Sequence, residues 1–261
     1  MTTFDAIILG IVQGLTEFLP ISSSGHLIIA REVFGITTAG GLAFDAVLQC
    51  ATALAIALYF WRDLYSLARG TLAREREALF EVLYLAVATV PAVLLGILLE
   101  EAMETVFRSV ALVAGTLIVG SLIMAAIEWI VRAQARSELT APRAISIGLF
   151  QALALVPGMS RSGMTIVGGM LAGLSREAAT RFAFLLGIPV LLGSGLKKIL
   201  DIAQGTDSAG ALMPLAVGGV VAFVVGLLVI HYLLKFLRTH TLMPFVWYRL
   251  ALAAVLFLSV V

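Results

Sequence analysis

Long apolar segments follow one another along almost the whole chain, and this succession restricts the fold more than any other feature. A helix needs about 20 apolar residues to cross the roughly 30 Å hydrocarbon core of a bilayer. Six segments have that length: Leu42–Trp61, Leu79–Leu99, Phe107–Val131, Glu177–Leu200, Ala211–Phe236 and Met243–Val261. Only 13% of the residues are charged and 61% are hydrophobic, so polar groups cannot cover the surface of a soluble fold. We therefore expect an all-α polytopic membrane protein that forms a single integral domain.

Two further apolar stretches are interrupted by polar corners. The first, Phe4–Phe34, breaks at Pro20 and the SSSG motif Ser22–Gly25, and the second, 144–174, breaks at Pro157 and the SRSG motif Ser160–Gly163. Each half has 9 to 16 residues, or about 13–24 Å as a helix, which is too short to cross. Irregular backbone at membrane depth has to be covered by protein or water. The sequence therefore predicts two re-entrant helical hairpins whose tips are buried together, in addition to six transmembrane helices.

The two interrupted stretches carry related motifs in the same order. GIVQGL before the first corner aligns with GLFQAL before the second at an offset of 138, and SSSG aligns with SRSG at the same offset. Chance similarity among apolar residues is the alternative, but the shared glutamine and the S-x-S-G step are polar. Three spans separate the copies, and an odd number inverts one copy relative to the other. We expect an inverted-topology repeat of about 4–131 and about 144–261, with its site at the midplane.

Basic residues predict the orientation, because cytoplasmic loops carry an excess of Lys and Arg. The residues assigned to the cytoplasmic face are Arg62, Arg69, Arg74, Arg76, Arg132, Arg136, Arg143, Arg176, Lys235 and Arg238. The opposite face holds Arg31, Arg108, Lys197 and Lys198. The first hairpin then enters from outside and the second from inside. The formal net charge of +1 and the lack of a basic patch give no reason to expect a nucleic-acid partner.

Each corner begins a half-helix, where free N–H groups and the positive end of the helix dipole favour an anion. The residues expected to bind substrate are Gln13, Ser22, Ser24, Gly25, Ser160, Ser162, Gly163 and Thr165. Serines that merely cap helices are the simpler explanation. Capping does not explain Arg161, because an arginine inside a membrane costs at least about 2.5 kcal/mol and needs a partner. We therefore favour a phosphate or diphosphate held between the corners.

Four polar residues at the corners are candidates for catalysis: Glu17, Ser23, His26 and Arg161. His26 follows Ser23 by three residues, so it can face the serine within one helical turn and take a proton from it or from water. The planar fork of Arg161 suits bidentate phosphate recognition, with an internal ion pair to Glu17 as the alternative. Three roles are open to Glu17: binding a divalent cation, orienting His26, or exchanging protons.

Other polar residues receive smaller roles. Asp45 and Gln49, four residues apart near the start of a span, are expected to line the pocket. Glu128 and Arg249 are interpreted as interfacial or packing residues, and the remaining histidines, His231 and His240, as structural.

The stretches GIVQGLTEFLPISSSGH, from Gly10 to His26, and LVPGMSRSGMTI, from Leu155 to Ile166, resemble the undecaprenyl-diphosphate phosphatase family of bacteria, the BacA/UppP type. The likeness covers essentially the whole chain. It implies a hydrolase of the bacterial cytoplasmic (inner) membrane that converts undecaprenyl diphosphate to undecaprenyl phosphate. That lipid carrier serves peptidoglycan synthesis, cell wall biogenesis and cell shape, and the family is linked to bacitracin resistance. The resemblance also implies dependence on a divalent cation, Mg²⁺ or Ca²⁺. We further expect a site that opens to the periplasmic side and a homodimer.

The resemblance assigns roles to individual residues. The family's E/Q-x-x-x-E motif falls on Gln13 and Glu17, its functional serine on Ser23, its histidine on His26 and its arginine on Arg161. Many members carry glutamate where Gln13 stands, so a two-carboxylate metal site is in doubt here. A cation would be held largely by Glu17 and the phosphates of the substrate.

The expected reaction is attack of Ser23, deprotonated by His26, on the terminal phosphorus, with direct attack by water as a variant. A polyprenyl-phosphate flippase or an ion-coupled transporter is the alternative, because inverted repeats with broken helices are typical of transporters. The Ser23/His26 pair favours the enzyme, since transport does not need it.

Overall fold

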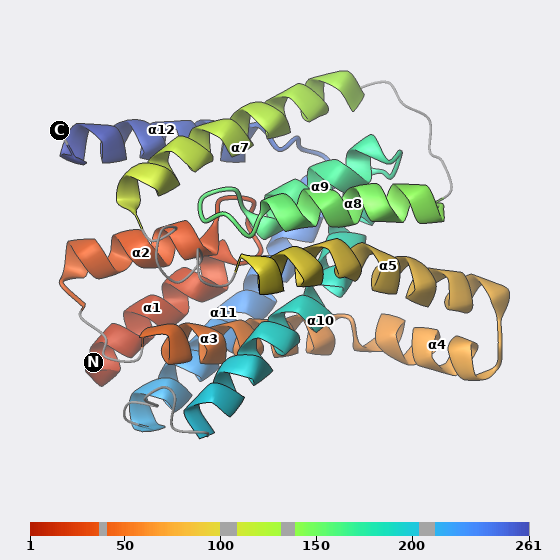
Figure 1. Ribbon diagram of the computed structural model, residues 1–261, viewed down its shortest axis with the longest axis horizontal. Helices are drawn as coiled ribbons and strands as arrows, with labels where there is room; N and C mark the ends of the chain where they lie inside the picture. Colours follow the sequence, from red (N-terminus) through yellow and green to blue (C-terminus); the bar gives the residue numbers. More distant parts are fainter. Residues whose placement is uncertain (37–40, 100–108, 132–138, 204–211, 261) are drawn as a thin grey trace.

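The computed structural model describes residues 1–36, 41–99, 109–131, 139–203 and 212–260, without side-chain detail at a few helix ends. The secondary structure of these ranges is helical and contains no strand (Figure 1). The helices are α1 (Thr3–Thr16), α2 (Ser23–Phe34), α3 (Gly41–Tyr59), α4 (Trp61–Leu72), α5 (Arg76–Leu98), α7 (Val110–Ile130), α8 (Ala141–Leu153), α9 (Arg161–Leu171), α10 (Arg176–Ala203), α11 (Leu212–Leu237) and α12 (Met243–Val260). The expected span ends Phe107, Ala211 and Val261 and the basic residues Arg108, Arg132 and Arg136 lie outside the described residues, as does the side chain of Lys198.

Four of these helices are long and apolar enough to cross a membrane: α5, α7, α10 over Arg176–Lys197, and α11. A fifth results if α3 and α4, which meet at 73°, count as one broken span. The apolar parts of α1 and α12 are shorter. The all-helical membrane class expected from the sequence is confirmed. Helix length within the described residues supports four or five spans, so the expected number of six is not confirmed.

The expected span Leu42–Trp61 ends two residues early, because the chain bends at Phe60 and continues as α4. The segment after Arg69 is helical as far as Leu72, turns at Ala73 and Arg74, and continues as α5 from Arg76. α4 carries Arg62, Asp63 and Arg69 beside Leu64, Leu67 and Leu72, so it is amphipathic. Such a helix is suited to lie along a membrane surface.

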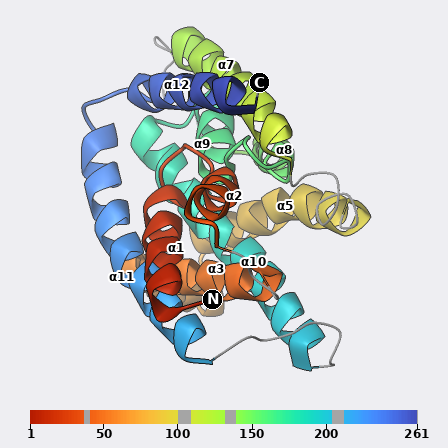
Figure 2. The same cartoon turned by 90° about the vertical axis from the view of Figure 1, so that its left-hand side faces the viewer.

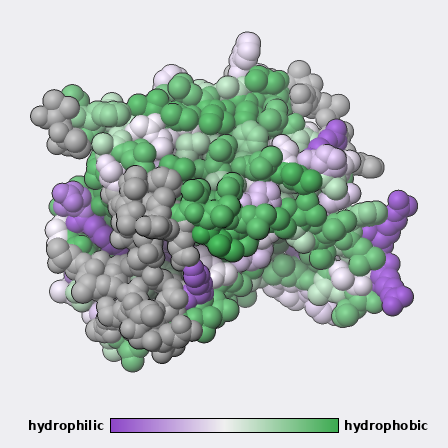
Figure 3. All heavy atoms as spheres, viewed as in Figure 1, coloured by the Kyte–Doolittle hydropathy of each residue, from purple (hydrophilic) through white to green (hydrophobic). Residues whose placement is uncertain are grey.

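The outer surface of the molecule is largely apolar. Leu72, Leu98 and Leu258 are 86%, 75% and 82% exposed. In Figure 3 the part of this face that is not grey is mostly hydrophobic, and a strongly hydrophilic group lies at the turn between α4 and α5. Such an apolar surface suits contact with lipid instead of water.

Small residues let the helices approach closely around the interrupted stretches. The most extensive packing joins α1 to α11, and the next joins α8 to α5 (Figures 1 and 2). A Cβ added to Gly10 would lie 2.6 Å from the carbonyl oxygen of Gly218, and one added to Gly148 would overlap the backbone of Ala88. Glycine at such contacts is a common way to pack helices in membranes. Each first half-helix is thereby held against a long helix from the other half of the sequence.

We predict that Gly148→Ala lowers the thermal unfolding temperature of the purified protein in detergent. The new methyl group would overlap Ala88 and push α8 away from α5, and overpacking of this kind costs roughly 1–3 kcal/mol. Gly115→Ala is the matched control, because no atom lies within 4 Å of a Cβ added there. Its better helix propensity should leave the unfolding temperature unchanged or raise it. Equal effects of the two substitutions would contradict this account of the α5–α8 contact.

Candidate active site

The two polar corners adopt the same unusual backbone conformation. Ser22 and Ser160 have φ values of 77° and 74°, which L-residues rarely adopt. Each serine is the N-cap of the following helix: Ser22 Oγ accepts from the Gly25 N–H at 3.4 Å and Ser160 Oγ accepts from the Gly163 N–H at 3.2 Å. The two motifs therefore start α2 and α9 with the same local geometry, in which strain is tolerated because the surroundings hold it.

Hydrogen bonds join the two corners directly. The Gly158 N–H donates to Ser22 Oγ at 3.0 Å, and Ser162 Oγ donates to the Leu19 carbonyl at 2.9 Å. Residues that are about 140 positions apart in the chain thus satisfy one another's polar groups. The two corners form one connected polar unit.

Glu17 connects residues from both corners. Its carboxylate is 5% exposed and forms an ion pair with Arg161. Ser23 Oγ donates to the other carboxylate oxygen at 2.6 Å, and Gln13 Nε2 donates to that same oxygen at 2.9 Å. The structure therefore brings together three of the four expected catalytic residues, with Gln13 beside them.

Gly187 of α10 makes room for the guanidinium of Arg161. A Cβ at this position would overlap Arg161 Nη1. Any larger residue would displace the guanidinium, so α10 helps to set the direction of Arg161.

His26 lies at the same corner but forms no hydrogen bond with Ser23. Its Nδ1 is 2.7 Å from the Ser22 carbonyl oxygen, which can only accept, so Nδ1 carries a proton. Its Nε2 lies 2.8 Å from the Tyr248 hydroxyl, and the two rings stack at 5.7 Å. Within the described residues Ser23 donates to Glu17 instead. The expected Ser23–His26 hydrogen bond is absent from this arrangement, because the ring turns back to a carbonyl of its own helical turn.

The polar groups of the first corner are more accessible than those of the second. Ser24 is exposed and Ser23 and His26 are partly exposed, whereas Gly25 is buried. At the second corner Ser160, Ser162, Gly163 and Thr165 are all buried. Thr165 Oγ1 donates to the Arg161 carbonyl at 2.8 Å, and the hydroxyls of Ser160 and Ser162 are 3.2 Å apart. These hydroxyls hold the second corner together, and a ligand would reach the site past the first.

Arg249 and Tyr248 of α12 were not expected at the site. Arg249 is fully buried and donates to backbone carbonyls of both corners, so its interpretation as a packing or interfacial residue understates its contacts. The signal was present in the sequence: Arg249 interrupts an apolar run, and an arginine at membrane depth needs a partner, as Arg161 does.

The remaining polar residues have partners elsewhere. Asp45 forms an ion pair with Arg31, and Gln49 Oε1 accepts from Ser194 Oγ at 3.0 Å, so these contacts do not link either residue to the corners. Glu128 is buried and forms an ion pair with Arg176, which makes it an internal residue. His240 stacks on Phe236.

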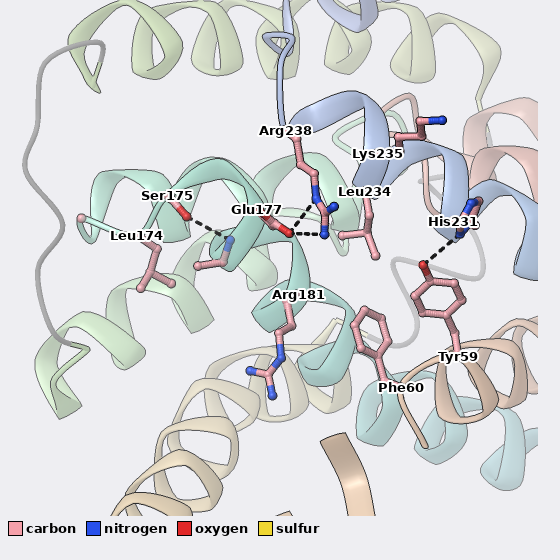
Figure 4. A pocket seen from close by; sticks show the side chains of 12 residues that line it. Tyr59, Phe60, Leu174, Ser175, Glu177, Arg181, His231, Leu234, Lys235 and Arg238 are labelled. Atoms are coloured by element: carbon pink, nitrogen blue, oxygen red, sulfur yellow. Dashed lines mark hydrogen bonds and ion pairs between the residues drawn. The ribbon is translucent and has the colours of Figure 1, made fainter. Parts of the chain in front are cut away.

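A separate cavity of about 760 Å³ lies between the end of α3, the start of α10 and the end of α11 (Figure 4). Its cationic side chains are largely paired: Arg238 bonds Glu177, and Arg181 bonds Asp63 and Glu81. His231 lies 3.3 Å from the Tyr59 hydroxyl. None of the corner residues lines this cavity, so it is distinct from the candidate site.

The protein groups at the corners do not form a cation site by themselves. Across the described part of the chain, no three His, Cys, Asp or Glu side chains gather closely enough to hold a metal. Both carboxylate oxygens of Glu17 already accept hydrogen bonds, and Gln13 turns its amide NH₂ toward that carboxylate. Oxygen ligands from a bound phosphate would be needed to complete a coordination shell.

Comparison with known proteins identifies the same family that the sequence resembles. The family described as bacitracin resistance protein BacA matches residues 6–255. Proteins named undecaprenyl-diphosphatase are similar over nearly the whole chain. The one from Renibacterium salmoninarum is 42% identical over 98% of this chain and 95% of its own length. That from Thermobifida fusca is 44% identical over 97% and 88%, and that from Alteromonas mediterranea is 41% identical over 98% of each. The chain that brings Glu17, Ser23 and Arg161 together therefore belongs to the BacA family.

Proposed function

We propose that this chain is an integral membrane phosphatase that hydrolyses undecaprenyl diphosphate to undecaprenyl phosphate and inorganic phosphate. The observation that carries the proposal is the Glu17 carboxylate, which joins the Ser23 hydroxyl of one corner to the Arg161 guanidinium of the other. The hydroxyl can act as a nucleophile, the carboxylate that accepts its hydrogen bond can act as a base, and the neighbouring guanidinium can bind an anion. The relatives named undecaprenyl-diphosphatase indicate the substrate.

The geometry supports Ser23 as the nucleophile and Glu17 as its base. Ser23 Oγ attacks the terminal phosphorus while its proton passes to Glu17 Oε2, 2.6 Å away. The bond from that phosphorus to the bridging oxygen breaks, and undecaprenyl phosphate leaves. Water then attacks the phosphoserine and releases inorganic phosphate and Ser23. Direct attack by water activated at Glu17, with Ser23 binding the phosphate, is the variant mechanism.

Groups from both corners can stabilise the negative charge on the transferred phosphoryl group. Arg161 is 15% exposed at its side chain, so its guanidinium can turn from Glu17 toward a phosphate. The N–H groups of Ser23 and Ser24 stand in the first turn of α2, before intrahelical bonding begins. Phosphoryl transfer depends mainly on such positioning and electrostatic stabilisation. A divalent cation that arrives with the diphosphate stays a prediction.

Six transmembrane helices and two re-entrant hairpins, related as an inverted repeat, are part of the proposal. The equal corner geometries at Ser22 and Ser160 support it. The packing of the first half-helices also supports it, because each packs on a helix of the other copy. α1 of the first copy packs on α11 of the second, and α8 of the second packs on α5 of the first. α3 and α12 would complete the six spans, with local bilayer thinning accommodating the short α12.

Ion pairs support the proposed orientation. Asp63, Glu81 and Arg181 join α4, α5 and the start of α10, and Glu177 and Arg238 join that same start to the end of α11. Helix ends expected at the cytoplasmic face thus meet at one end of the molecule. The accessible first corner would then open to the periplasmic side of the inner membrane. On that side of the membrane the enzyme would recycle undecaprenyl phosphate, the lipid carrier for peptidoglycan synthesis, and would confer resistance to bacitracin. A homodimer also stays a prediction.

We predict that the purified protein releases phosphate from undecaprenyl diphosphate in detergent, and that Ser23→Ala lowers the rate at least about 100-fold, because the nucleophile is lost. Phosphate release is measured directly, and mass spectrometry searches for phosphoserine at Ser23 after rapid quenching. Ser66→Ala, an exposed serine on α4, is the control. Full activity of Ser23→Ala would exclude the covalent route. No phosphate release by the wild type, together with lipid translocation in vesicles, would favour a flippase or transporter instead of an enzyme.

We predict that Arg161→Lys is nearly as damaging as Arg161→Ala, with both lowering kcat by about 100-fold or more. An ammonium group is a point charge and cannot replace the planar fork that faces Glu17 and a phosphate. Steady-state phosphate release measures the effect, and Arg69→Lys, an exposed residue of α4, serves as the control. Normal turnover by Arg161→Lys would rule out bidentate recognition.

A further inference from the structure

Arg249 is a buried cation whose contacts are all with uncharged acceptors in the described part of the chain. It is fully buried in the first half of α12, within an apolar segment. Its hydrogen bonds run to four carbonyls and one hydroxyl: Nη1 to Pro20 O at 3.3 Å and Met159 O at 3.1 Å, Nη2 to Gly158 O at 2.9 Å and Leu117 O at 3.2 Å, and Nε to Ser121 Oγ at 3.0 Å. The guanidinium therefore uses all three nitrogens.

These acceptors come from three separate parts of the chain. Pro20 belongs to the first corner, Gly158 and Met159 belong to the second, and Leu117 and Ser121 belong to α7. Where the interrupted helices stop, carbonyls lose their helical donors, and lipid cannot replace them. One guanidinium can serve several such carbonyls at once because it carries five N–H donors in a fixed plane. Arg249 thus fastens both corners to α7 and α12 at a single point.

A glycine of α7 leaves space for the guanidinium of Arg249. A Cβ on Gly120 of α7 would overlap Arg249 Nη2, so glycine leaves the space that the guanidinium fills. Gly187 gives the same accommodation to Arg161. The neighbouring residue on α12, Tyr248, contacts the first corner through His26. α12 therefore contacts the candidate site at two consecutive residues.

We propose that Arg249 is the positioning residue of the site: it holds the two corners in the register in which Ser23 and Arg161 meet at Glu17. The proposal rests on the proposed function for its catalytic consequence. Arg249 acts through backbone carbonyls on the side of the corners that faces α7 and α12. Its loss would leave four buried carbonyls without their charged donor and would free the corners to shift relative to each other.

The test compares Arg249→Met and Arg249→Lys with Arg181→Met, which removes an arginine that bonds Asp63 and Glu81 away from the corners. Hydrogen–deuterium exchange of the folded protein in detergent reports on the two corner segments, 18–25 and 156–163. We expect both Arg249 variants to raise exchange in both segments together and to lower kcat about 100-fold with KM changed less than about threefold, as expected for a small misplacement of reacting groups. Arg181→Met should change neither corner.

A second pair of variants keeps the test decisive if the Arg249 variants fail to fold. Gly120→Ala displaces the guanidinium without removing it, and Gly115→Ala on the same helix meets open space. Gly120→Ala should loosen both corners and lower kcat at least tenfold, whereas Gly115→Ala should not. Folded Arg249→Met or Gly120→Ala protein with wild-type exchange at either corner, or with wild-type kcat, would overturn the proposal. If the wild type releases no phosphate while both corners still loosen in the variants, the proposed function fails and the positioning role stands.

Discussion

Two helices stop inside an apolar chain, and the backbone N–H and C=O groups at their ends lack helical hydrogen-bond partners. These groups must find partners within the protein, and the rest of the structure depends on how they do so. Lipid offers no hydrogen bonds, so each corner is stable only where other polar groups cover it. Here each corner covers the other. Ser22 accepts from Gly158, Ser162 donates to Leu19, and Arg249 donates to both sides.

The same requirement explains why charged residues are gathered at one place. Burying a carboxylate and a guanidinium separately would cost several kcal/mol each, whereas a hydrogen-bonded pair offsets much of that cost. Glu17 therefore lies against Arg161, and the remaining carboxylate oxygen accepts from Ser23 and Gln13. The arrangement that satisfies the buried charge is also one that can bind a phosphate and accept the proton of a serine. Stability of the corners and chemistry at the corners are consequences of the same contacts.

Close packing of α1 on α11, and of α8 on α5, holds this polar unit in place. Glycines at positions 10 and 148 bring each half-helix against a long helix from the other half of the chain. Glycines at positions 120 and 187 leave room for the two guanidinium groups. In both uses glycine matters because it has no side chain, and not because of its backbone freedom. An aliphatic residue would be compatible with the membrane at these positions but not with the neighbouring atoms.

The sequence by itself determined the membrane class, the two interrupted stretches, and Glu17, Ser23 and Arg161 as residues that meet at the corners. Composition excludes a soluble surface, Pro and Ser/Gly steps stop helices at short lengths, and a lone Glu17 or Arg161 in an apolar run needs a polar partner. Only the tertiary structure decided the pairing. A spacing of three residues allowed Ser23 to meet His26, but the His26 ring bonds the Ser22 carbonyl and Tyr248, and Ser23 bonds Glu17. Arg249 lies more than 80 residues from either corner, so its contact with them follows from helix packing, which local sequence pattern does not encode. The bend at Phe60 likewise depends on where α4 can lie, and apolar length alone could not place it.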